Sequence, residues 1–151
     1  MQEPSYLKLH REGEIKKRIA KLKEIIKDCH LCPHNCKVNR LKGETGVCKS
    51  DSRLKVASYG PHFGEEAPLV GTKGSGTIFF SNCSLQCVYC QNHDISQKGH
   101  GQYMSPKEVA DIMLNLQKRG CHNINFVTPT HMVYGIIKAV DKAIEQGLKI
   151  P

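Results

Sequence analysis

Three cysteines within eight residues constrain this chain more than any other feature of its sequence. Cys83, Cys87 and Cys90 follow a short run, residues 76–80, that has the composition of a buried strand. Residues 91–94 (Gln-Asn-His-Asp) then read as a loop, so the thiols should lie at the carboxyl end of a strand. Clustered thiols in a reducing compartment are more often metal ligands than disulfides, so the loop predicts a metal-containing site.

A second group of cysteines lies nearer the N-terminus, at Cys29, Cys32, Cys36 and Cys48. A Cys-x2-Cys pattern on a turn, followed by two more thiols, is typical of tetrahedral metal ligation. The residues leave zinc and a second iron–sulfur cluster as alternatives, because four thiolates hold either one. The histidines between these cysteines are expected to be solvated.

The length and charge limit the remaining classes of function. The 151 residues fit one domain, or one domain with a small appendage. The net charge of +8 could suggest nucleic acid, but Lys and Arg concentrate in residues 8–27 and bound thiolates would lower the charge. No apolar run has the length of a membrane span and residues 1–10 contain no leader-like segment, so we expect a cytoplasmic protein without a membrane partner.

The chain divides into two predicted parts. Residues 1–52 contain an amphipathic helix over 13–28 and the first cysteine group, which forms a metal-binding segment. Residues 53–151 begin with a strand over 53–59 and continue as alternating strands and helices, an α/β pattern.

The alternating pattern predicts a parallel sheet with helical crossovers. A capping box with proline at Ser105-Pro106 begins the first predicted helix, and Gly120 ends it. A strand is predicted over 123–128. Thr130 is predicted to cap the next helix, Gly147 to end it, and residues 148–151 to begin a further strand. Two strands and the start of a third do not complete such a sheet. We therefore expect the front part of a longer, truncated or split polypeptide.

Three thiolates have a particular chemical value. They can hold three corners of a four-iron cluster and leave the fourth iron without a protein ligand. A cluster with four cysteine ligands can only pass electrons, whereas an open iron can bind a substrate or cofactor. The carboxyl ends of parallel strands are also where α/β folds place their active sites.

The pattern Cys83-x3-Cys87-x-Tyr89-Cys90 resembles the signature of the radical S-adenosylmethionine (SAM) superfamily. Residues 60–66, 74–80 and 90–92 resemble the branch of iron–sulfur proteins homologous to pyruvate formate-lyase activating enzyme. The early Cys29-x2-Cys32-Pro33 motif fits that branch as well, so the similarity covers nearly the whole chain from Cys29 onward.

The resemblance implies a partial, TIM-like β/α barrel and a [4Fe-4S] cluster on Cys83, Cys87 and Cys90. SAM would chelate the open iron, with Tyr89 near its adenine and Asn92 also in the cofactor site. Reductive cleavage of SAM would give a 5′-deoxyadenosyl radical that abstracts hydrogen, an oxidoreductase-type reaction. An electron donor such as a flavodoxin or ferredoxin and a protein substrate are the implied partners.

The sequence departs from that branch at the end of the second predicted strand. The activating enzymes carry Gly-Gly-Glu there to bind the SAM amino group, and this chain has Thr128-Pro129-Thr130-His131. Thr128 and Thr130 are expected to supply hydroxyls to that group. His131 either donates a hydrogen bond to SAM or substrate or is a polar residue that starts a helix. The family barrel also has more strand–helix units than this chain supplies, so we expect a chain that holds a cluster but turns over poorly.

Two other functions fit parts of the sequence. A zinc-stabilised nucleic-acid-binding module would explain the basic charge and the two cysteine groups, but basic and aromatic residues are not interleaved. An electron-transfer iron–sulfur protein would need a fourth thiolate beside the three, and only Cys121 remains.

Overall fold

The fold is built around one four-stranded sheet. A computed structural model describes residues 3–151, in which the strands take the order β3-β1-β2-β4. The strands are β1 (Leu54–His62), β2 (Ser75–Phe80), β3 (Gln102–Met104) and β4 (Ile124–Val127). The protein is therefore a mixed α/β structure, as the strand and helix pattern predicts.

The prediction of a wholly parallel sheet is wrong. β2 and β4 run parallel, with Ile78 opposite Phe126, but β1 is antiparallel to both β2 and β3. A long connection containing a helix returns the chain to run β4 parallel to β2, whereas the shorter stretch between β1 and β2 reverses it. The predicted strand at 148–151 is not a strand, although the Ile124 N–H donates to the Pro151 carbonyl over 2.7 Å.

Helices account for most of the remaining order. The α-helices of the described residues are α1 (Ser5–Arg11), α2 (Glu14–Ile25), α3 (Ala67–Val70), α4 (His93–Ser96), α5 (Pro106–Lys118) and α6 (Val133–Glu145). Their 3-10 helices are η1 (Ile26–Asp28), η2 (Arg40–Lys42) and η3 (Thr130–Met132). The predicted helix over 13–28 is confirmed as α2 continued by η1.

The N-termini of α5 and α6 differ in how they are capped. The capping box at the start of α5 is confirmed: Ser105 Oγ accepts from the Glu108 N–H, and the Glu108 carboxylate accepts from the Ser105 N–H. The prediction that Thr130 caps the last helix is wrong. Thr130 begins η3, and α6 follows from Val133 without a side-chain cap.

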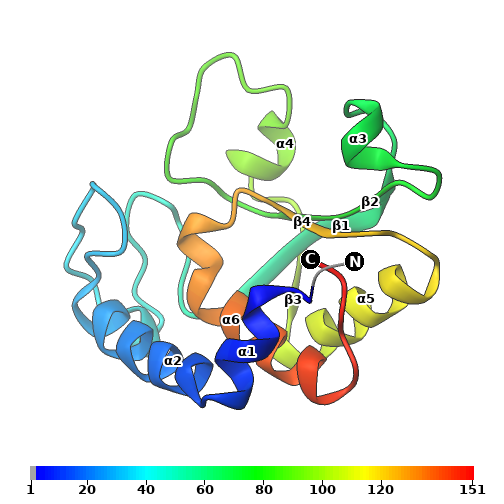
Figure 1. The fold of residues 1–151 in the computed structure, drawn as a ribbon. Helices are drawn as coiled ribbons and strands as arrows, with labels where there is room; N and C mark the ends of the chain where they lie inside the picture. Colours follow the sequence, from blue (N-terminus) through cyan, green and yellow to red (C-terminus); the bar gives the residue numbers. More distant parts are fainter. Residues whose placement is uncertain (1–2) are drawn as a thin grey trace.

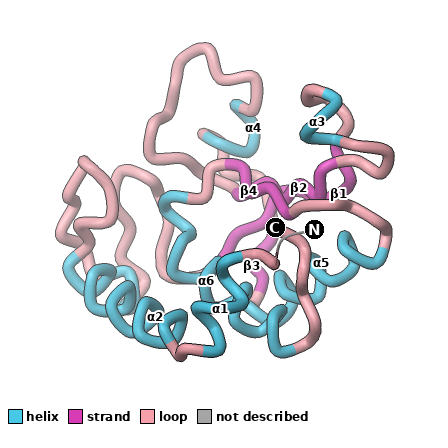
Figure 2. The backbone as a smooth tube through the Cα atoms, viewed as in Figure 1, coloured by secondary structure: helices cyan, strands magenta, loops and turns pink. Residues whose placement is uncertain are grey.

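The core lies between one face of the sheet and helices α5 and α6 (Figure 1). Ile78 and Phe80 of β2 are fully buried there against Val109 and Met113 of α5 and Ile136 of α6. α1 and α2 lie beyond α6, while α3 and the long loop that carries α4 rise on the other side of the sheet (Figure 2). None of the helices in the described part of the chain has the length and apolar character needed to cross a bilayer.

Candidate functional site

The loop after β2 is fixed at its root by Asn82. This buried residue adopts a left-handed backbone conformation with φ 68°, and its N–H donates to the Ile95 carbonyl over 2.7 Å. Its side-chain amide donates to the Lys49 carbonyl and to Ser50 Oγ, 3.1 and 2.9 Å away. The loop therefore leaves the strand end in one direction and is tied to the segment that precedes β1.

The three cysteines of this loop line a single cavity of about 160 Å³, which we call the three-cysteine cavity. Its lining includes Cys83, Cys87, Cys90, Asn92, Ser96 and Thr128. Thr128 comes from the end of β4, so the cavity lies where the carboxyl ends of the parallel pair β2 and β4 meet. This is the location that the sequence predicts for the three thiols.

Hydrogen bonds from the same loop reach the sulfur atoms. The Leu85 N–H donates to Cys83 Sγ over 3.4 Å, and the Ser96 hydroxyl donates to Cys90 Sγ over 3.3 Å. Hydrogen bonds to the sulfur ligands tune the potential of an iron–sulfur cluster. The loop thus supplies hydrogen-bond donors to two of its three sulfur atoms.

The donor set fits a four-iron cluster with one iron left open. Among the described residues no cysteine other than these three lines the cavity. Cys121 lies in the core and is 2% exposed, and burial raises the pKa of its thiol. No three His, Cys, Asp or Glu side chains within residues 3–151 have the spacing of ligands around one metal ion. A cluster does not require that spacing, because each thiolate binds a different iron atom.

Asn92 and Thr128 are the two predicted cofactor residues that the structure brings to the cavity. Thr128 is β-branched and has φ 55°, a conformation that costs energy outside glycine. Its hydroxyl lies 2.7 Å from the Val127 carbonyl and 3.2 Å from the Phe80 carbonyl, which accept its proton. The oxygen lone pairs of Thr128 stay available for a donor such as an ammonium group.

The other three predicted cofactor residues lie elsewhere. Tyr89 is 86% exposed and is not part of the cavity lining, and Thr130 is exposed in η3. His131 is 3% exposed, and its ring Nε2 lies 2.9 Å from the Ser81 carbonyl. Burial lowers the His131 pKa, so the ring is neutral near pH 7. The predicted contact of His131 with SAM does not match this placement.

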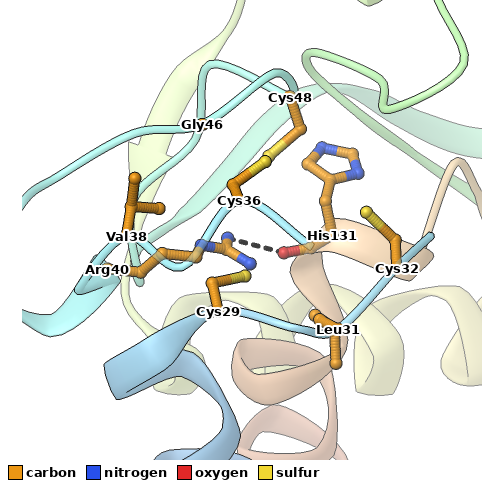
Figure 3. A pocket seen from close by; sticks show the side chains of 9 residues that line it. All are labelled: Cys29, Leu31, Cys32, Cys36, Val38, Arg40, Gly46, Cys48 and His131. Atoms are coloured by element: carbon orange, nitrogen blue, oxygen red, sulfur yellow. Dashed lines mark hydrogen bonds between the residues drawn. The ribbon is translucent and has the colours of Figure 1, made fainter. Parts of the chain in front are cut away.

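The second cysteine group surrounds a separate space, which we call the four-cysteine cavity (Figure 3). Cys29, Cys32, Cys36 and Cys48 line it together with Gly46, Arg40 and His131. Cys29 and Cys48 are buried, and the pKa of Cys48 is raised by burial against the opposing effect of Arg40. A Cβ on residue 46 would lie 2.6 Å from Cys36 Sγ, so only glycine fits there.

Two hydrogen bonds join the two cysteine groups directly. The His34 Nε2, from the turn between Cys32 and Cys36, lies 2.7 Å from the Ser84 carbonyl. The Gln86 side-chain amide donates to the Val47 carbonyl over the same distance. Each bond connects a residue that neighbours one cysteine group to a residue that neighbours the other. His34 is exposed, as the sequence predicts, and it also makes the hydrogen bond to the Ser84 carbonyl.

Several residues that shape these sites were not predicted from the sequence. Arg40 is the clearest case, because arginine is usually exposed and nothing in its surroundings in the sequence marks it as buried. Ser96 carries no motif either. Asn82 and Gly46 do leave a signal, since an asparagine two residues after a strand and a glycine two residues before a cysteine are typical turn residues.

Comparison with known proteins places the site in a family. The family model of the Radical SAM superfamily matches residues 77–150, which include the three-cysteine loop, α5, β4 and α6. Residues before 77, including the four-cysteine cavity, lie outside that match.

Two proteins of Methanocaldococcus jannaschii are similar over longer stretches. The uncharacterized protein MJ0674 is 40% identical over 139 residues, which cover 84% of this chain and 38% of the relative. The uncharacterized protein MJ0808 is 24% identical over 123 residues, 70% of this chain and 35% of the relative. The chain thus spans less than two fifths of the length of either relative, and no solved structure matches it. The comparison therefore finds a Radical SAM superfamily domain at residues 77–150, just under half of this chain.

Proposed function

We propose that Cys83, Cys87 and Cys90 hold a [4Fe-4S] cluster whose fourth iron binds SAM. The observation that carries this proposal is the three-cysteine cavity, where three thiols meet at the ends of two parallel strands. When bound, the reduced cluster would supply the electron that splits SAM into methionine and a 5′-deoxyadenosyl radical. The residues of the chain hold the thiolates, orient SAM and exclude water from the cavity.

The hydroxyl of Thr128 and the amide of Asn92 are the polar groups proposed to bind SAM. Both residues line the cavity beside the thiols. The Thr128 oxygen would accept a hydrogen bond from the SAM ammonium while its own hydroxyl donates to the carbonyls of Phe80 and Val127. This arrangement replaces the Gly-Gly-Glu motif of the activating enzymes with a single hydroxyl acceptor. Tyr89 and Thr130 would contribute only after moving toward the cavity.

The finer assignments rest on the resemblance to pyruvate formate-lyase activating enzyme. The proposed fold is a partial β/α barrel that begins with β2 and β4. The proposed reaction is hydrogen abstraction from a protein substrate. The proposed electron donor is a flavodoxin or ferredoxin in the cytoplasm. We also propose that residues 1–52 form an appendage with its own metal, and that residues 53–151 form the front part of the barrel. In that case the parallel strands β2 and β4 with their helices would need further strand–helix units before the protein could turn over SAM efficiently.

The test is anaerobic reconstitution of the 151-residue chain with iron and sulfide. We expect about four iron and four sulfide at the three-cysteine cavity. After reduction with dithionite, added SAM should yield 5′-deoxyadenosine, detected by mass spectrometry. Cys87→Ala should abolish the product, and Cys121→Ala, a matched change outside both cavities, should retain it.

Each alternative function has its own outcome in this experiment. Zinc without sulfide at Cys83, Cys87 and Cys90 would contradict the proposal and favour the nucleic-acid-binding module. A reducible cluster that gives no 5′-deoxyadenosine would favour electron transfer. Sustained turnover by the 151-residue chain would refute only the need for further barrel units.

A further inference from the structure

A buried positive charge beside the four-cysteine cavity lacks an adequate counter-charge. Arg40 is 3% exposed, and its guanidinium donates to the carbonyls of Ser50, Asp51 and His131. Carbonyl oxygens satisfy its N–H groups but do not neutralise its charge. The Asp51 carboxylate is bound to the guanidinium of Arg53, 2.6 Å away, so it is shared with a second cation. A buried ion that is incompletely paired is costly.

We propose that Cys29, Cys32, Cys36 and Cys48 bind one divalent ion of the zinc class as thiolates, and that Arg40 is the counter-cation of this centre. Four thiolates around a divalent ion leave a net charge of about two negative units. The cavity that the four thiols line is the one that Arg40 also lines, so the opposite charges meet there (Figure 3). This site lies outside the radical SAM match and does not depend on the proposed function.

The size of the cavity favours a single ion over a second iron–sulfur cluster. Its enclosed volume is about 10 Å³, against about 160 Å³ for the three-cysteine cavity. A space of that size holds roughly one water-sized particle. The missing Cβ of Gly46 leaves just enough room for Cys36 Sγ. A four-iron cluster would need more space than this cavity encloses.

The backbone already forms the turns that such a site requires. The Cys29 N–H donates to the Val38 carbonyl and the Lys37 N–H to the Cys29 carbonyl, both over 3.0 Å, which closes a loop around the first three thiols. Asn35 and Lys37 hold positive φ angles of 47° and 59° within that loop. Non-glycine residues adopt this conformation when the surrounding structure requires it.

Closure around an ion requires the thiols to move toward one another. The thiols do not yet have the spacing of ligands around one ion in the described structure. Cys32 and Cys36 are only partly buried, so their χ1 angles can change without displacing core residues. Cys29 and Cys48 are the buried pair toward which they would turn.

The test measures metal content and coordination rather than activity. Protein purified without reconstitution should contain about one zinc per chain. That zinc should remain when Cys83, Cys87 and Cys90 are all changed to serine, and it should be lost in Cys48→Ser. Replacement by Co²⁺ should give the intense sulfur-to-metal absorption and the visible bands of a tetrahedral thiolate site.

The role of Arg40 is tested by competition with a chelator. We expect Arg40→Met to weaken zinc binding about 10- to 100-fold, and Arg40→Lys, which keeps the charge, to restore most of it. Equal affinities in the two variants would refute the counter-cation role. If Arg40→Met does not fold, the Co²⁺ spectrum of Arg40→Lys and the wild type still tests the site itself.

Three results would overturn the metal assignment. They are zinc that survives Cys48→Ser, zinc that leaves with Cys83, Cys87 and Cys90, and iron with sulfide in the triple variant in place of zinc. The last result would identify a second cluster. Because the triple variant cannot form the proposed SAM-binding cluster, failure of either proposal can be told from failure of the other.

Discussion

At the scale of the residue, the structure distinguishes the side chains that share one cavity from those that merely share a motif. Asn92 and Thr128 reach the three-cysteine cavity from different elements, although they lie 36 positions apart in the sequence. Tyr89, which lies inside the signature itself, is exposed. The spacing of the cysteines in the sequence is enough to predict them as ligands. The direction in which each neighbouring side chain points depends on the path of the loop, and no local sequence pattern specifies that path.

Substitutions of Thr128 can separate its proposed role in binding SAM from the cost of its strained backbone conformation. Glycine at this position would accept φ 55° more easily and would also remove the hydroxyl that we propose binds SAM. We expect Thr128→Gly to keep or raise the melting temperature while weakening SAM binding about tenfold, the effect of one hydrogen bond to a charged group. The control is Thr128→Ser, which retains the hydroxyl. Calorimetric titration of the reconstituted protein with SAM makes the measurement, and equal affinities would contradict the assigned role.

Gly46 offers a test of packing in the four-cysteine cavity. The added Cβ of Gly46→Ala would lie 2.6 Å from Cys36 Sγ. We expect a loss of roughly 1–3 kcal/mol in the free energy of unfolding, the usual cost of overpacking, together with weaker zinc retention. Gly60→Ala is the matched control, because a Cβ there meets nothing within 4 Å. Urea unfolding of both variants decides the point: equal stability would show that the cavity rearranges freely.

At the scale of the element, the sequence predicts the long helices and buried strands better than the sheet that joins them. α5 and β2 follow from a capping box and a continuous apolar run. β3, with three residues, and the antiparallel direction of β1 were not predicted. Strand direction is decided by which edges meet in three dimensions, and a three-residue strand is too short to show a period.

The capping box of α5 provides a quantitative test at this scale. Ser105→Ala removes the acceptor for the Glu108 N–H, which should cost about 1 kcal/mol of stability. Hydrogen bonds from the Ser105 N–H hold the pKa of Glu108 below its usual value. The Glu108 carboxylate therefore contributes stability above the pKa that Glu108 has in the unfolded chain. This contribution is lost as the pH falls through the lower pKa that Glu108 has in the folded protein. Thermal unfolding at pH 7 and pH 3 should show a smaller difference between Glu108→Ala and wild type at pH 3, because that variant removes the carboxylate which accepts from the Ser105 N–H.

At the scale of the whole molecule, the N-terminal segment and the radical SAM domain are joined near their cysteines. Asn82, His34 and Gln86 each carry a hydrogen bond between residues 34–50 and residues 82–86. α2 also packs against α6 of the domain. The division at residue 52 that the sequence suggests therefore separates two parts that support each other. Long-range pairing of polar side chains with backbone carbonyls leaves no trace in sequence periodicity, which is why it was not predicted.

This connection predicts that the N-terminal segment stabilises the three-cysteine loop. Changing His34 and Gln86 together to alanine removes two bonds between the groups. We expect faster amide hydrogen exchange across residues 83–97 and slower or less complete cluster formation, with helices α5 and α6 unaffected. Val88→Ala on the same loop is the control, because that side chain is 97% exposed. Unchanged exchange in the double variant would show that the bonds of His34 and Gln86 do not hold the loop.

The central claim is that three thiolates leave one iron open for SAM. Electron paramagnetic resonance of the reduced, reconstituted protein, recorded with and without SAM, tests it most directly. We expect a [4Fe-4S] signal that needs Cys83, Cys87 and Cys90 and that changes in shape when SAM binds the open iron. A signal that SAM leaves unchanged, or that persists in the Cys87→Ala variant, would contradict it.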